Sequence, residues 1–136
     1  LGAHLPETYI ASDSQRLTAY KRLASAGDES VLAEMEEELR DRFGHLPEEA
    51  AHLFTLLDLK LLLRRLWIKR LDAVNGEFIL TFCEKPEIDL DRLTRLIAAE
   101  QKRLRLTPEH RLYFNSSSLD VVTSITELKK LLHNLM

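Results

Sequence analysis

A run of leucines between residues 53 and 66 constrains this chain more than any other feature of its sequence. Leucine falls on every side of a helix drawn through this segment, at positions 53, 56, 57, 59, 61, 62, 63 and 66. A helix that is apolar all round is usually buried. Residues 46–49, of sequence LPEE, suit its start, because proline fits the first turn and acids favour the positive end of the helix dipole. The pattern predicts a central helix of about 20 residues, roughly 30 Å long.

The period of the apolar residues changes directly after the leucine run. Residues 67–74 are typical of a strand, Asn75-Gly76 is a strong signal for a type I′ hairpin, and residues 77–83 return as a second strand. Phe78, Leu80 and Phe82 alternate with more polar residues, so they share one face of that strand. The sequence therefore predicts a β-hairpin that follows the central helix.

Capping signals predict two helices before the leucine run. Ser12 and Gln15 have the spacing of a capping box and begin a helix that we expect Gly27 to end. Asp28 can cap a second helix, which Gly44 ends.

The segment after the hairpin predicts two more helices and two short strands. Asp89 caps a helix whose inward side is predicted to hold Leu90, Leu93, Leu96 and Ile97. Residues 104–106 and 111–115 are predicted strands, and Ser116–Ser118 are expected to supply a break and an N-cap. The last helix is predicted to carry Leu119, Val122, Ile125, Leu128, Leu132 and Leu135. The order α-α-α-β-β-α-β-β-α predicts an α+β fold, with a helical N-terminal half packed on a small antiparallel or mixed sheet.

Composition and motif searches favour one domain that performs no chemistry. The 136 residues fit a single domain, and the start at Leu1 suggests a piece of a longer protein. The isolated glycines form no phosphate loop, the histidines lack metal-ligand spacing, and the single cysteine, Cys83, is best explained as a small buried thiol at the end of an apolar strand. No segment is typical of a signal peptide or a membrane span, so we expect a cytoplasmic location.

Acidic residues gather on the second predicted helix. Seven acids and one base occupy residues 28–41, although the whole chain has a net charge of only −3. Glu34, Glu38 and Asp41, here called the acidic ridge, stand four and three residues apart and share one helix face. Glu36–Arg40 and Glu38–Arg42 are predicted to offset part of the repulsion. The ridge is either an ordinary solvated face or a docking surface for a basic partner.

A basic stretch follows over residues 59–71. It holds five bases and no acid, and these bases are Lys60, Arg64, Arg65, Lys69 and Arg70. Because leucines are interleaved with them, the bases are interpreted first as aliphatic stems that extend from a core or as partners of the acidic helix. A nucleic-acid-binding module that uses residues 60–70 is the alternative.

Three segments resemble a known family when they are taken together. They are Tyr9-Ile10 leading into Arg16-Leu17-x-x-Tyr20-Lys21-Arg22-Leu23-Ala24, the string ELRDRFGHLP at residues 38–47, and the strand start Leu66-Trp67-Ile68. Their order and spacing resemble the C-terminal domain of the bacterial transcription-repair coupling factor, Mfd, over about residues 5–115. The family often has glycine where this chain has Trp67.

The resemblance implies a regulatory domain of a large helicase-type, ATP-dependent DNA translocase. Such proteins displace stalled RNA polymerase and recruit nucleotide-excision repair through UvrA. The domain itself is expected to be non-catalytic and without a cofactor, because ATP and Mg²⁺ belong to the motor domains. It is expected to dock on a UvrB-like module of the same protein and to mask the UvrA-binding surface.

The resemblance also assigns roles to individual positions. Glu38 and Asp41 are the acids expected to meet arginines of the UvrB-like module, and Glu34 is added only because it shares their helix face. The structural part of the motif is expected to be Phe43, Gly44, Leu46 and Pro47. In that part, Phe43 enters the core, Gly44 adopts a left-handed stop, and Pro47 starts the next helix.

Overall fold

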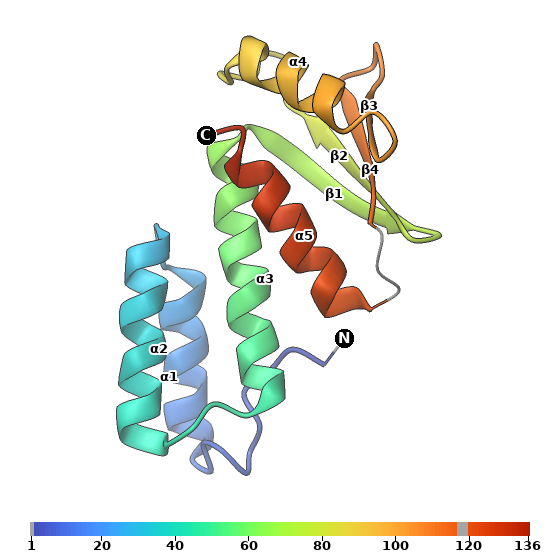
Figure 1. The fold of residues 1–136 in the computed structure, drawn as a ribbon. Coiled ribbons are helices and arrows are strands. Elements are labelled where there is room, and N and C mark those ends of the chain that lie inside the picture. The colour runs from blue at the N-terminus through green and yellow to red at the C-terminus, as the bar shows by residue number, and fades with distance from the viewer. Residues whose placement is uncertain (1, 117–119) are drawn as a thin grey trace. The chain divides into compact units, whose positions relative to one another are not determined.

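The computed structural model of the chain describes residues 2–116 and 120–136 and has the predicted order of elements (Figure 1). The helices are α1 (Asp13–Ala24), α2 (Glu29–Phe43), α3 (Glu48–Arg65), α4 (Leu90–Ala99) and α5 (Val121–His133). The strands are β1 (Ile68–Val74), β2 (Glu77–Phe82), β3 (Leu104–Leu106) and β4 (Arg111–Asn115). The fold is α+β, as predicted, and its sheet is wholly antiparallel.

The chain divides into two compact units, residues 1–61 and residues 62–136. We call them the helical unit and the sheet unit. The helical unit contains α1, α2 and most of α3, whereas the sheet unit contains the last turn of α3, all four strands, α4 and α5. Each unit is described by itself below.

The helical unit has one apolar core that every one of its segments helps to form. Its buried members are Leu5, Ile10, Leu23, Leu32, Leu39, Leu46, Ala50, Phe54 and Leu61. Ser12 and Asp28 cap α1 and α2 as predicted, because their side chains accept hydrogen bonds from the backbone N–H groups of Gln15 and Val31. Residues as far apart in the sequence as Leu5 and Leu61 thus belong to one core.

The prediction that Gly27 ends α1 is wrong. The helix ends at Ala24, and Ser25 is its C-cap in the right-handed region, with φ −92° and ψ −2°. The Ser25 N–H donates to the carbonyls of Lys21 and Arg22. These bonds close the last turn without a left-handed residue, so no glycine is needed there.

Gly44 ends α2 as predicted, but not in the left-handed helical conformation. Its φ is 89° and its ψ is −164°, a region that is essentially restricted to glycine. The Gly44 N–H still donates to the Arg40 carbonyl, and Pro47 directly precedes α3. This conformation turns the chain from α2 toward α3 within four residues.

The sheet has the strand order β1-β2-β4-β3. Strand β4 therefore lies between β2 and β3, and the two hairpin-like segments form one continuous sheet. Leu80 faces Leu112, and Phe78 faces Phe114, across β2 and β4. Leu80, Leu112 and Phe114 are completely buried, which identifies this side of the sheet as the core side.

The turn predicted at Asn75-Gly76 is confirmed, and Trp67, which leads into the hairpin, has an unusual backbone conformation. Asn75 and Gly76 have φ values of 51° and 79°, as a type I′ turn requires. Trp67 also has a positive φ, 60°, and its carbonyl accepts from the Cys83 N–H at 2.8 Å. It precedes β1 rather than starting it, in a conformation that glycine adopts more easily. Cys83 is half-buried, not buried as predicted.

The helices of the sheet unit follow the predicted pattern except at Leu90 and Leu135; Leu135 is buried but lies beyond α5, which ends at His133. Asp89 caps α4, and Leu93 is buried, but Leu90 is 65% exposed and does not face inward. Leu90 is the first residue of α4, and it lies about 60° round the helix from Leu93. Asp120 is the N-cap of α5, so Ser116 does not supply it as predicted. The predicted roles of Ser117, Ser118 and Leu119 lie outside the described residues.

We predict that Gly44→Ala lowers the free energy of unfolding by about 1–3 kcal/mol. The added Cβ meets no atom within 4 Å, so the loss would come from the backbone conformation alone. Urea denaturation of the two proteins measures it. Gly27→Ala is the matched control, because that Cβ is also unobstructed and its φ is not positive; equal stability losses in both variants would contradict the assignment.

Candidate docking surface on α2

Among the described residues, the acids of α2 from Glu34 onward divide into a set that forms ion pairs and a set that forms none. Glu36 pairs with Arg40 at 3.2 Å, and Glu38 with Arg42 at 3.7 Å, as the spacing predicted. Glu34, Glu37 and Asp41 are exposed. Within residues 2–116 and 120–136, no ion pair joins these three acids to a base.

Glu38 is also bound by an arginine of the neighbouring helix. Arg22 of α1 donates through both terminal nitrogens, with Nη1–Oε1 at 3.0 Å and Nη2–Oε2 at 2.7 Å. This forked arrangement is the strongest geometry for an arginine–carboxylate pair. The hydrogen bonds from Arg22 lower the pKa of Glu38. Glu38 is therefore ionised and held at the boundary between α1 and α2.

The acidic ridge is thus composed differently from the predicted one. The structure places Glu34, Glu38 and Asp41 on α2 as expected, but Glu38 is already engaged within its own unit. Glu37, which the sequence analysis did not single out, is exposed with Glu34 and Asp41. Those three residues are spaced by three and four, so they share one face. We call Glu34, Glu37 and Asp41 the free acidic face.

Arg22 was missed as a site residue, although the sequence held a signal for it. It belongs to the first segment of the family resemblance, and Glu38 begins the second. Two helices joined by four residues are usually antiparallel neighbours, and this adjacency could have suggested the pair. Only the structure selects Arg22 from the nearby bases.

Tyr9 stabilises the C-terminal end of α2 through hydrogen bonds from its hydroxyl. Its hydroxyl lies 3.0 Å from the carbonyl oxygen of Leu39 and 2.8 Å from that of Gly44, and it donates to them. Its ring is 5.9 Å from the ring of Phe43. Partial burial raises the pKa of Tyr9, so the phenol keeps the proton that these bonds need.

The motif residues Phe43 and Leu46 both contribute to the packing of the helical unit. Leu46 is in the core of the helical unit, and Phe43 packs against that core while it remains half-buried. Arg42 lies over the Phe43 ring at 5.0 Å. The string at residues 38–47 therefore combines a core anchor, a glycine turn, the paired carboxylate of Glu38 and the exposed carboxylate of Asp41.

The first segment of the resemblance anchors the N-terminal arm. Arg16 donates to the carbonyl of Ile10 at 2.9 Å, and the Tyr20 hydroxyl accepts from the Leu5 N–H at 2.7 Å. Both bonds hold extended residues against α1. The polar residues Arg16 and Tyr20 of this segment thus position the arm that carries Tyr9.

The basic stretch is exposed but divided between two kinds of element. Lys60, Arg64 and Arg65 lie on α3, and Lys69 and Arg70 lie on β1. Arg70 pairs with Asp72 at 2.8 Å. The stretch does not form one continuous helix face, and this removes the simplest form of the nucleic-acid alternative.

The comparisons with known proteins identify the family. The model of the TRCF domain family matches residues 1–93. This chain belongs to the TRCF domain family. Transcription-repair-coupling factors of Escherichia coli and Haemophilus influenzae are 31% and 36% identical to the chain over 131 and 98 residues, which are 96% and 72% of its length.

A solved structure supports the same conclusion for the fold. It is the crystal structure of a C-terminal domain of transcription-repair coupling factor, with a TM-score of 0.85, and the match covers 99% of this chain and 87% of that one. Its identity of 19% makes this a likeness of fold alone. The TRCF chain spans about 11% of the Escherichia coli relative and 12% of the one from Rickettsia bellii.

Two further observations describe the TRCF chain chemically. In the part of the chain that the structure describes, no three His, Cys, Asp or Glu side chains are grouped so that they could hold a metal ion. None of the helices in those residues combines the length and apolar character that a membrane crossing requires.

We predict that Arg22→Met raises the pKa of Glu38 toward its ordinary value, since the hydrogen bonds from Arg22 are the main cause of its shift. A carboxyl whose pKa is lowered by folding stabilises the fold above its unfolded pKa, and this contribution disappears as the pH falls through the folded pKa. The stability difference between wild type and variant should therefore vanish in acid. Side-chain NMR titration and urea denaturation across pH measure both effects; a pH-independent difference would contradict the prediction.

Tyr9→Phe should destabilise the helical unit by about 1 kcal/mol. The variant keeps the ring contact with Phe43 but loses the hydrogen bonds from the hydroxyl to the carbonyls of Leu39 and Gly44. Chemical denaturation measures the loss. Tyr113→Phe, in β4, is a comparison variant whose ring is also half-buried. A Tyr9→Phe protein as stable as wild type would show that the hydroxyl does not fasten α2.

Proposed function

We propose that this TRCF domain is a non-catalytic, autoinhibitory module. In this proposal, α2 docks on arginines of a UvrB-like module in the same protein, and docking masks the surface that recruits UvrA. The parent protein would be an ATP-dependent DNA translocase that displaces stalled RNA polymerase in the bacterial cytoplasm. ATP and Mg²⁺ would be bound by its motor domains, and this chain would need no cofactor.

One observation carries the proposal: α2 exposes Glu34, Glu37 and Asp41, which lack ion-pair partners among the described residues. Like charges three and four residues apart on a helix repel one another by a few tenths of a kcal/mol per pair. When cations of a partner cover such a surface, this repulsion is relieved and binding becomes more favourable. The fold does not need these acids, so a docking role accounts for them better than a structural one.

The pair between Glu38 and Arg22 refines this docking surface. Because Arg22 already holds both oxygens of Glu38, an arginine of the partner would share this carboxylate or displace Arg22. Asp41 has no such competitor in the described ranges. We therefore assign the larger part of the docking energy to Asp41 and the free acidic face, and a positioning role to Glu38.

The structure also shows how to test docking without damage to the fold. Reversal of Glu38 would place two cations against each other between α1 and α2, and could unfold the unit. Glu34→Lys with Asp41→Lys leaves the Arg22–Glu38 pair intact. Glu84→Lys with Glu109→Lys is the matched control, because both positions are exposed and the change in net charge is the same.

We expect Glu34→Lys/Asp41→Lys to weaken binding to the isolated UvrB-like module at least tenfold, about 1.4 kcal/mol. Truncation of a desolvated charge pair costs about 2–5 kcal/mol, whereas a rim charge has little effect. Calorimetry with the two purified partners measures the affinity. In the full-length protein the same change should release UvrA binding and raise ATPase activity.

The control variant separates charge in general from this surface. Glu84→Lys/Glu109→Lys should bind the UvrB-like module as tightly as wild type does. If a folded Glu34→Lys/Asp41→Lys protein stays repressed and binds the module normally, α2 is not the docking surface. Equal losses in both variants would also reject it.

A further inference from the structure

The two units carry opposite charge, which the net charge of the chain conceals. Residues 1–61 contain 6 bases and 12 acids, whereas residues 62–136 contain 13 bases and 10 acids. The sheet unit is therefore net positive, although the chain as a whole is at −3. An anionic partner of the sheet unit would be favoured where its bases are gathered.

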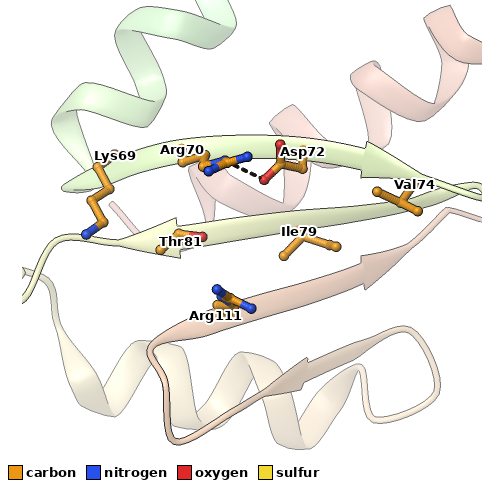
Figure 2. Close-up of a pocket in the computed structure, with 7 residues that line it drawn as sticks. All are labelled: Lys69, Arg70, Asp72, Val74, Ile79, Thr81 and Arg111. Atoms are coloured by element: carbon orange, nitrogen blue, oxygen red, sulfur yellow. Dashed lines mark hydrogen bonds and ion pairs between the residues drawn. The ribbon is translucent and has the colours of Figure 1, made fainter.

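Bases gather on the side of the sheet that no helix of the unit covers. Figure 2 shows α4 and α5 passing behind the sheet, while the labelled side chains stand on its front. Arg70 is opposite Thr81, and Thr81 is opposite Arg111, so one row crosses β1, β2 and β4. Side chains directly opposite each other have Cβ atoms about 5 Å apart. The row is thus a line of two guanidinium groups with a hydroxyl between them.

The row borders a hollow of about 510 Å³. Its lining residues are Lys69, Arg70, Asp72, Val74, Ile79, Thr81 and Arg111 (Figure 2). Lys69 and Arg111 are exposed, and over the described residues neither forms an ion pair. Three cations therefore face one concave surface, and two of them are not neutralised.

The third cation, Arg70, is oriented by its ion pair with Asp72 but remains exposed and able to bind a ligand. Its Nε donates to Oδ2 of Asp72 at 2.8 Å, and its side chain is 71% exposed. A bond through Nε leaves the two terminal nitrogens of the guanidinium available. Those nitrogens form the fork that matches two oxygens of a phosphate.

The next row adds an apolar and aromatic surface to the cationic one. Ile79 is opposite Asp72 on β1 and Tyr113 on β4. Arg105 of β3 lies over the Tyr113 ring, with its Cζ atom 4.2 Å from the ring centre. The uncovered face thus places donors beside a half-buried apolar strip, over four antiparallel strands.

We infer that this uncovered face binds the sugar-phosphate backbone of single-stranded nucleic acid. Phosphates would meet Lys69, Arg70 and Arg111, and the Thr81 hydroxyl supplies a further donor. The strip of Ile79 and the Tyr113 ring, which Arg105 covers on one side, suits sugars, and proteins that bind single strands combine apolar and aromatic surfaces with a basic groove. An acidic peptide would pair with the cations but would have no apolar or aromatic group in every position to contact this strip. The inference concerns the sheet unit and is independent of docking by α2.

The test measures binding of the whole 136-residue chain to a fluorescein-labelled oligothymidylate of about 16 nucleotides by fluorescence anisotropy. Binding to single strands weakens with salt, with a slope of log K against log salt of about −0.7 per phosphate contacted. Three contacts predict a slope of about −2. Absence of binding at about 50 mM salt would overturn the inference.

Two variants with the same change in charge locate the binding surface. Lys69→Glu/Arg111→Glu should lose at least tenfold in affinity and flatten the salt slope, with circular dichroism unchanged. Lys102→Glu/Lys130→Glu, at exposed positions off this row, should bind nearly as wild type does. Lys69→Gln/Arg111→Gln repeats the test without reversed charge. Equal losses in the first two variants would show that only bulk charge acts.

Two competing ligands decide the chemical class. Labelled decaglutamate should bind more weakly than the oligothymidylate, and a DNA duplex of equal length should also bind more weakly, because a rigid double helix cannot follow the flat strip. Tighter binding of decaglutamate would reassign the face to an acidic protein. Tighter binding of the duplex would reject a single-strand surface.

Discussion

The apolar surface of α3 is the constraint on which the rest of the structure depends. A helix with leucine on every side gains from cover by protein, because full burial of one leucine contributes about 1.5–3 kcal/mol. Leu59, Leu61, Leu62 and Leu66 are buried, whereas the other leucines of the run are half-buried. Ala50, Phe54 and Leu61 of this helix complete the core of the helical unit. Leu62 and Leu66, which follow in the sheet unit, are also buried. Both units therefore organise apolar residues around successive parts of one segment.

Some charged side chains of this chain form ion pairs within their own unit, and others form none among the described residues. Arg22 and Glu38 join α1 to α2, and Glu36 and Arg40 support α2 itself. Among the described residues, Glu34, Glu37 and Asp41 are some of the charges without an ion pair on one unit. Lys69 and Arg111 are some of those on the other. A functional interpretation is best placed on these charges, because the paired groups already have a structural explanation.

Prediction from the sequence succeeded where the signal was local. Ser12, Asp28 and Asp89 cap helices because the side-chain oxygen of each residue accepts a hydrogen bond from a free backbone N–H three residues later, within the first helical turn. Asn75-Gly76 makes its hairpin because two positive φ angles suit these residues. It failed at Gly27 and Leu90, where a competing backbone bond or a position at the first helical turn decided the outcome. It also overlooked Arg22 and Glu37, whose roles depend on which neighbouring bases reach the acids.

The sequence by itself determined the order of elements, their caps and turns, the family, and the concentration of acid on α2. These properties depend on residues a few positions apart, or on a motif that survives as a string. Only the tertiary structure decided that β4 lies between β2 and β3, that Arg22 engages Glu38, and that Arg70, Thr81 and Arg111 form one row. The contacts of Arg22 with Glu38, and of Thr81 with Arg70 and Arg111, join residues 11 to 30 positions apart. Their geometry is set by the packing of whole elements, which no local pattern encodes.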